Sequence, residues 1–220
     1  MTRESTTRWL LTAGVIGPVF FVVSFLIEGW IRPNYDPQRQ FVSLLSLTDE
    51  GWQQIGNFLL TGALFTAAAV GWRRAMPDGP GCRWVPALLG LAGIGLMVAG
   101  IFVTDAGYGY PAGAPPGTPP VASWHGVIHD LASVWILFGL PVAMFVMARR
   151  FRAEGGRWAP FQGEGRRWSL YSLLSGIAGL AALVAAFMLP DVSGLLQRVA
   201  IVIGFGWVAQ VSSRFRAEVV

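Results

Sequence analysis

Residues 84–104 read WVPALLGLAGIGLMVAGIFVT, a run of 21 residues that carries no charged side chain. Because about 20 apolar residues are enough for a helix to cross the hydrocarbon core of a bilayer, this run predicts a transmembrane helix. The composition of the whole chain agrees with this interpretation. Hydrophobic residues make up 54% of the 220 residues and charged residues 13%, which is too apolar for an ordinary soluble domain of this length.

Further apolar runs lie on both sides of this one. They are continuous rather than alternating, so helices are expected rather than the strands of a barrel. The first run is longer than the apolar core of a signal peptide, and we expect it to be retained. The sequence therefore predicts an all-α polytopic membrane protein, a single integral membrane domain over residues 1–220 built as a bundle of six transmembrane helices. The predicted spans are residues 9–31, 54–72, 84–104, 125–148, 168–189 and 194–213.

Positive charges lie between the apolar runs, where they indicate topology. The chain has 16 arginines and no lysine, and only Arg32, Arg39 and Arg198 fall on the opposite side from the others. The positive-inside rule then places both termini in the cytoplasm and the protein in the cytoplasmic (inner) membrane. This pattern favours membrane lipid as the partner and argues against nucleic acid. The other arginines are Arg3, Arg8, Arg73, Arg74, Arg83, Arg149, Arg150, Arg152, Arg157, Arg166, Arg167, Arg214 and Arg216.

Tryptophan and cysteine add two expectations. Tryptophans stand at the ends of the runs, as interfacial anchors do; these are Trp9, Trp30, Trp52, Trp72, Trp84, Trp124 and Trp168. Cys82 is the single cysteine, and one thiol supports neither a disulfide nor a thiolate metal site. Between the first two spans, the apolar residues of 41–48 alternate with serine and threonine, which predicts a short interfacial helix over the outer mouth of the bundle.

Polar groups inside the spans gather near their outer ends, whereas the inner halves hold little besides Gln210. Ionisable side chains at membrane depth cost a few kcal/mol each unless they pair, bind a ligand or meet water. Their clustering therefore predicts a shared pocket in the outer half of the bundle. The groups concerned are Glu28, Asn57, Asp105, His125, His129, Asp130 and Arg198.

One interpretation of this cluster is a metal site. His125 and His129, the only two histidines, are four residues apart, so a helix presents both rings on one face. Asp105 lies across a linker rich in glycine and proline and would add a carboxylate. With water in the fourth position, these three ligands would form an open, catalytic type of zinc site.

The remaining polar residues would complete such a site. Glu28 or Asp130 would orient an imidazole or act as general base. Ser43 or Ser46 would hydrogen-bond the polarised water or the substrate. Arg198 would hold an anionic head group, because guanidinium binds phosphate through two parallel hydrogen bonds.

The alternative interpretation is structural. Arg198 would pair with Asp105 or Glu28, and the histidines would cap the fourth helix and face interfacial water. The same groups could form a proton-sensing cluster. Asp130 is offset by about 100° from His129 on a helix, so it would meet a neighbouring helix rather than share the histidine face.

Several segments together resemble the bacterial domain-of-unknown-function family 998. They are VSLLSLTDEG (residues 42–51), TGALFTAAAVGWRR (61–74), GIFVTD (100–105), HGVIHDLASVWILF (125–138) and GLLQR (194–198). The resemblance implies a six-span membrane protein of unestablished function. Its GxFxxD, HGxxHD and GLxxR elements mark Asp105, His125, His129 and Arg198, and the first segment marks Ser43 and Ser46.

A more distant likeness is to the ceramidase and progestin-receptor superfamily of membrane metallohydrolases. These proteins combine a serine, an aspartate and three histidines, two of them in HxxxH, on seven spans. Ser43 or Ser46, Asp105, His125 and His129 would match, while this chain has six predicted spans and two histidines. The likeness implies metal-dependent hydrolysis.

The sequence thus leaves three functions open. The first is an outer-leaflet pocket that binds a divalent metal and acts on or recognises a lipid-like or amphipathic molecule. The second is a small proton-linked transporter, although the inner halves lack the polar groups of a through-path. The third is a non-catalytic membrane scaffold. The sequence does not decide whether the protein is an enzyme.

Overall fold

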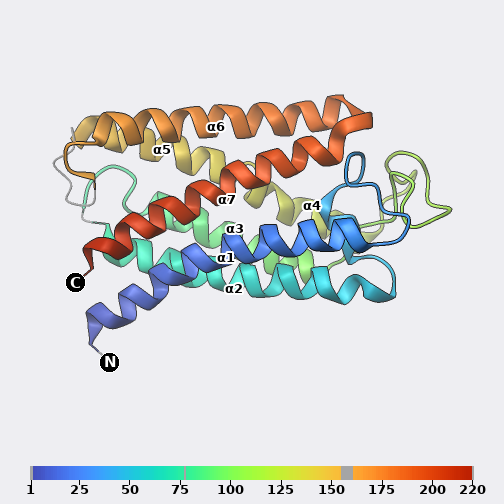
Figure 1. The fold of residues 1–220 in the computed structure, drawn as a ribbon, viewed down its shortest axis with the longest axis horizontal. Coiled ribbons are helices and arrows are strands. Elements are labelled where there is room, and N and C mark those ends of the chain that lie inside the picture. Colours follow the sequence, from blue (N-terminus) through green and yellow to red (C-terminus); the bar gives the residue numbers. More distant parts are fainter. Residues whose placement is uncertain (1, 77, 155–160, 220) are drawn as a thin grey trace.

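The structure is a computed structural model that describes residues 2–76, 78–154 and 161–219, and these residues form helices and linkers without a strand (Figure 1). The long helices follow the apolar runs. They are α1 (Arg3–Ile31), α2 (Trp52–Ala75), α3 (Trp84–Ile101), α4 (Trp124–Leu137), α5 (Gly139–Glu154), α6 (Gly165–Met188) and α7 (Ser193–Glu218). Short 3₁₀ turns are η1 (Val42–Ser46), η2 (Asp49–Gly51) and η4 (Pro190–Val192).

Six helical segments in the described residues are long and apolar enough to cross a membrane, which confirms the predicted number of spans. One of them is not a continuous helix. The predicted span 125–148 is divided into α4 and α5 at Phe138. Pro141 lies in the first turn of α5, where its missing N–H costs least, and it could not continue α4 without loss of a helical hydrogen bond.

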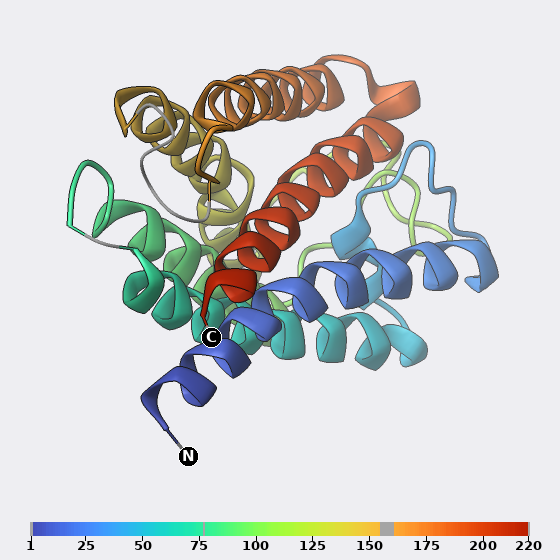
Figure 2. The same ribbon diagram turned by 60° about the vertical axis from the view of Figure 1, so that its left-hand side comes forward.

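The helices pack in a ring that follows the order of the chain. α2 lies between α1 and α3, α3 packs against α4 and α5, α5 against α6, and α6 against α7, which returns to α1. Figure 2 shows α7 running between α6 and α1. α4 packs mainly on α3. α6 packs on α5 and α7.

The two chain termini lie at the same end of the bundle (Figure 1). We call the opposite end the distal end; it carries the linkers 32–51, 102–123 and 189–192. Arg32, Arg39 and Arg198 belong to the distal end, and the helix ends rich in arginine lie near the termini. Arg157 lies outside the described residues.

Most of the expected anchor tryptophans are exposed on the outside of the bundle; they include Trp9, Trp30, Trp52, Trp84 and Trp124. Trp72 is different, because it is fully buried and its indole N–H donates to the hydroxyl of Ser212 over 2.8 Å. The prediction that Trp72 is an anchor was wrong. The half of the bundle near the termini therefore contains buried polar pairs, and Trp207 with Ser172 forms another.

The segment 41–48 does not form the predicted interfacial helix. It forms the 3₁₀ turn η1, in which Val42, Leu44 and Leu45 are buried. This turn contacts α1, α2 and α7. The apolar side chains are therefore buried inside the distal end of the bundle instead of lying flat on a bilayer surface.

Candidate functional site

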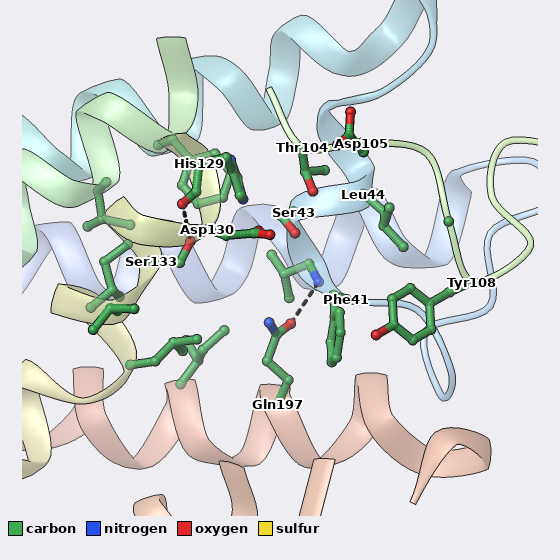
Figure 3. Close-up of a pocket in the computed structure, with 18 of the residues that line it drawn as sticks. Phe41, Ser43, Leu44, Thr104, Asp105, Tyr108, His129, Asp130, Ser133 and Gln197 are labelled. Atoms are coloured by element: carbon green, nitrogen blue, oxygen red, sulfur yellow. Dashed lines mark hydrogen bonds between the residues drawn. The ribbon is translucent and has the colours of Figure 1, made fainter. Parts of the chain in front are cut away.

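A pocket of about 400 Å³ lies inside the distal half of the bundle. This volume is within the range of small-molecule sites, about 300–1,000 Å³. Its apolar wall includes Phe21, Phe58, Leu137, Phe187 and Ile201. Its polar groups are Ser43, Thr104, Asp105, Thr118, His129, Asp130, Ser133 and Gln197 (Figure 3).

Aromatic rings close the pocket toward the chain termini. Phe21 and Phe205 line the pocket with ring centroids 5.0 Å apart, and Phe205 packs in turn on Phe65, which is fully buried, at 4.8 Å. Phe58 stacks on Phe21 at 5.5 Å. The small cavity that adjoins the pocket beyond Phe205 is lined by apolar side chains such as Leu140 and Met144, so the described residues offer no polar route toward the termini, which argues against the proton-linked transporter.

Within the described residues, the side of the pocket between α4 and α6 is not covered by another helix. Val134 and Phe138 at the end of α4, and Phe187 on α6, line the pocket and are 45%, 38% and 58% exposed. These exposed side chains belong to membrane-spanning segments. The pocket is thus accessible from the side, at the depth of the bilayer.

His125 and His129 cap the C-terminal end of α3. The last carbonyls of a helix have no partner within the helix; His129 supplies one to Ala99, and His125 binds Val103, two residues after α3 ends. Nδ1 of His125 lies 2.8 Å from the carbonyl oxygen of Val103, and Nδ1 of His129 lies 3.0 Å from those of Ala99 and Phe102. Since a carbonyl oxygen can only accept, Nδ1 carries the proton in both rings.

Asp105 completes the cap at the start of α4. The hydroxyl of Ser123 accepts from the backbone N–H of Gly126 over 3.0 Å, and the Asp105 carboxylate accepts from the backbone N–H of Ser123 over 2.8 Å. This is the arrangement of a capping box, in which the second bond usually comes from a glutamate three residues after the cap. That position is a glycine here, so Asp105 supplies the bond from the linker.

The environment of Asp105 favours its ionised form. Burial by itself opposes ionisation, but hydrogen bonding by Ser123, together with His125 and His129, lowers the pKa of Asp105 below its usual value. The negative charge also lies at the N-terminus of α4, where the helix dipole stabilises an anion. The end of α3 and the start of α4 therefore satisfy each other's unpaired backbone groups.

These residues do not fit a zinc site in this arrangement. No group of three or more His, Cys, Asp or Glu side chains is positioned to hold a metal ion within the described ranges. In Figure 3 the carboxylate of Asp105 points away from His129 and Asp130. The expected ligands instead bond to backbone groups, and metal binding stays a prediction from the sequence.

Asp130 faces the pocket. It leaves the face of His129, as its helical offset predicted, but it extends toward Ser43 in the turn η1 rather than meeting a neighbouring long helix (Figure 3). The carboxylate is exposed to the pocket, and within the part of the chain that the structure describes it has no hydrogen-bond or ion-pair partner. Asp130 is thus available to a ligand.

Arg198 holds the linker after α1. Its guanidinium donates from Nη1 to the carbonyl oxygens of Pro37, Gln40 and Gly194 over 2.8, 2.8 and 3.0 Å, and from Nη2 to the hydroxyl of Tyr35. The expected ion pair with Asp105 or Glu28 was wrong, because among described residues these bonds go to neutral oxygens. Arg198 is 7% exposed and does not line the pocket, so the expected role in binding an anionic head group has no support.

Tyr35 shares this network. Burial raises the pKa of Tyr35 to about 12, although the charge of Arg198 opposes the shift. The phenol is therefore protonated at neutral pH and donates to the carbonyl oxygens of Gln40 and Phe41, at 3.1 and 3.0 Å.

Two of the four residues expected to be catalytic lie away from the pocket. Glu28 is buried and forms an ion pair of 3.3 Å with Arg32. The Ser46 hydroxyl is directed at the carbonyl oxygen of Ser43, 2.6 Å away. Ser43 and Asp130 do line the pocket.

The sequence interpretation missed Gln197. Its side-chain oxygen accepts from the backbone N–H of Val42 over 2.9 Å and fixes η1 against α7 inside the pocket. A Cβ on Gly194 would lie 2.4 Å from the carbonyl oxygen of Gln40, so only glycine permits this approach. The available signal was the GLLQR segment, because residues 194, 197 and 198 share one helix face.

The comparisons with known proteins identify a family. A model of the family described as Protein of unknown function (DUF998) matches residues 15–214. No curated protein matches the chain, and no solved structure matches it.

Proposed function

This chain belongs to the family described as Protein of unknown function (DUF998), whose match covers residues 15–214, and we propose that it binds a lipid-like, amphipathic molecule in the distal pocket. The observation that carries this proposal is the shape and lining of that pocket. The pocket of about 400 Å³ is polar at one end and apolar at the other. Its side opens toward the lipid that would surround the membrane-spanning helices.

The division of the lining suits a molecule with a head and a tail. Asp130 and Ser43 lie at the polar end. Leu137 is seven residues further along α4, or about 10 Å deeper at the rise of a helix, and it lines the apolar part of the pocket together with Ile201 of α7. A polar head at Asp130 would therefore direct an apolar tail between α4 and α7.

The charge distribution supports an orientation for this site. Arginines lie near the termini end on α2, at Arg73 and Arg74, and on α7, at Arg214 and Arg216. By the positive-inside rule, we infer that both termini are cytoplasmic, that the protein lies in the inner membrane, and that the pocket opens toward the outer leaflet.

Binding is proposed rather than metal-dependent hydrolysis. The residues that would hold a metal are used as caps between α3 and α4. Transport is disfavoured for a separate reason, since the aromatic floor at Phe21, Phe58 and Phe205 separates the pocket from the termini end.

The test is photolabelling of the purified protein in phosphatidylcholine nanodiscs. The probes are long-chain compounds with a diazirine in the chain and an alcohol or an amine as the head group. We expect mass spectrometry to map the label to α4, α6 and α7 residues of the pocket. Val134→Trp places a large side chain in the pocket opening and should reduce labelling strongly.

Val127→Trp provides the matched control. Val127 is on the same helix and is 44% exposed, close to the 45% of Val134, but it does not line the pocket. Labelling of this variant should equal that of the wild type. Equal labelling of both tryptophan variants, or label spread over the outer faces of all helices, would refute the proposed binding site.

A further inference from the structure

We propose that the head group bound by this pocket is a cation, so that the ligand is a long-chain ammonium compound with Asp130 as its counter-charge. This inference rests on the proposed function, because it names the chemistry of the molecule that the pocket would take. It follows from the charges of the lining, the depth of Asp130 and the aromatic rings beside it.

Among the lining residues that the structure describes, only Asp105 and Asp130 carry a carboxylate and none is an arginine. Asp105 already accepts the backbone N–H of Ser123. Asp130 has no such bond within the described residues. A carboxylate in a membrane-spanning segment is costly unless it pairs or meets water, and an ammonium group would supply three donors and the opposite charge.

The depth of Asp130 matches the head group of a molecule that enters from the bilayer. Trp124 begins α4 and is 70% exposed, as expected for an anchor at the membrane interface. Asp130 is six residues later, or about 9 Å deeper along the helix. A charged head at Asp130 would thus lie just beneath the interface, with its chain in the apolar part of the pocket.

Aromatic rings and a hydroxyl line the same pocket as Asp130. Phe41 and Tyr108 line the pocket and contact each other edge to face, with centroids 4.9 Å apart. Ring faces attract ammonium groups, most strongly where water is excluded. The Ser43 hydroxyl also lines the pocket and has no hydrogen bond within the described ranges, so it can accept from an ammonium N–H.

Tyr108 responds to the charge of Asp130. Burial raises the pKa of the Tyr108 phenol, and the negative charge of Asp130 raises it further. Both side chains line the same pocket. An ammonium between them would meet a carboxylate on one side and a neutral aromatic ring on the other.

An anionic head group would find no matching charge here. Arg198 directs its N–H groups at Pro37, Gln40, Gly194 and Tyr35. Asp130 and Asp105 would both repel a phosphate or a carboxylate. The lining therefore selects against fatty acids and phosphate esters as well as favouring amines.

The experiment measures competition with the photoreactive probe by dodecylammonium, dodecanol and dodecanoate in phosphatidylcholine nanodiscs. These compounds have the same chain and differ only in the head group. We expect the wild type to bind dodecylammonium about tenfold or more tightly than dodecanol, as a partly solvated charge pair predicts, and dodecanoate most weakly. Asp130→Asn should bring the ratio of ammonium to alcohol close to one while dodecanol still competes.

Asp191→Asn is the matched control. Asp191 is also at the distal end, but its side chain is 84% exposed, pairs with Arg39 and lies outside the pocket. It removes the same charge from the same end, so the ammonium preference should persist. This control separates binding at Asp130 from attraction of the cation to the protein surface.

The outcomes distinguish the two proposals. Equal competition by ammonium and alcohol in the wild type, or an ammonium preference that survives Asp130→Asn, would overturn the cationic head group and leave the amphipathic pocket. Failure of all three compounds to compete, together with label outside the pocket, would overturn the proposed function itself.

Discussion

The carboxylate of Asp105 lies against the backbone of Gly126, so closely that a Cβ on Gly126 would lie 2.1 Å from Oδ2. This contact connects the start of the linker 102–123, four residues after the end of α3, with the first turn of α4. It brings the aspartate of the GxFxxD segment against the glycine of the HGxxHD segment. The aspartate needs the glycine for access, and the start of α4 needs the aspartate because Gly126 has no side chain to complete the cap.

Gly126→Ala should destabilise the protein, because the added methyl group displaces Asp105 from Ser123. We expect a loss of about 1–3 kcal/mol, typical of overpacking at a closely packed site. Thermal unfolding in detergent measures this loss. Gly206→Ala is the control, since no heavy atom lies within 4 Å of a Cβ at that helical position, and alanine there should be neutral or stabilising by about 0.5–1 kcal/mol. Equal effects of the two substitutions would contradict the contact.

The contribution of Asp105 should depend on pH. Its pKa is lower in the folded protein than in the unfolded chain, where it is about 3.9. The ionised group therefore adds stability above about pH 4, and this stability is lost as the pH falls through the folded pKa. Asp105→Asn should cost about 0.3–1 kcal/mol at neutral pH, the size of a helix-end charge. The difference in melting temperature between the two proteins should vanish in acid, whereas a constant difference would show that ionisation plays no part.

Arg198→Lys should loosen the linker between α1 and α2. A lysine has a single ammonium group and cannot reach Pro37, Gln40 and Tyr35 together, so buried carbonyl groups lose their donors at a cost of about 2 kcal/mol or more. Hydrogen exchange of residues 35–42 should accelerate. Arg39→Lys is the control, because Arg39 forms an exposed ion pair with Asp191, and its effect should stay within about 0.5 kcal/mol. Unchanged exchange in Arg198→Lys would disprove the clamp.

Much of the fold could be predicted from the sequence because lipid imposes a length and a composition on each span. The six spans follow directly from the apolar runs. The division of the fourth span at Phe138 was less visible, since Pro141 allows either a kink or a new start. Trp72 was misplaced because a tryptophan at the end of a run can be an anchor or, as here, a buried donor to Ser212.

The candidate site was predictable in place more than in chemistry. Polar residues at one depth predicted a shared pocket for seven groups, and three of them, Asp105, His129 and Asp130, line the pocket in the structure. The hydrogen-bond partners could not be predicted, because the histidines and Arg198 bind backbone carbonyl groups. Every residue has a backbone carbonyl, so the spacing of side chains in the sequence does not indicate which one is bound. An HxxxH pair looks the same whether its rings donate to a helix end or bind a metal.

Substitution of His129 can distinguish these two roles. If His129 acts as a cap, His129→Asn should retain part of the stability, because the asparagine amide can donate from about the position of Nδ1. His129→Leu should lose about 1–3 kcal/mol, since the carbonyl groups of Ala99 and Phe102 then lose a donor. A metal chelator should leave the melting temperature of the wild type unchanged. Stoichiometric zinc that both variants lose, with a wild type that melts lower in chelator, would instead establish the metal site, because neither leucine nor asparagine replaces an imidazole ligand of zinc.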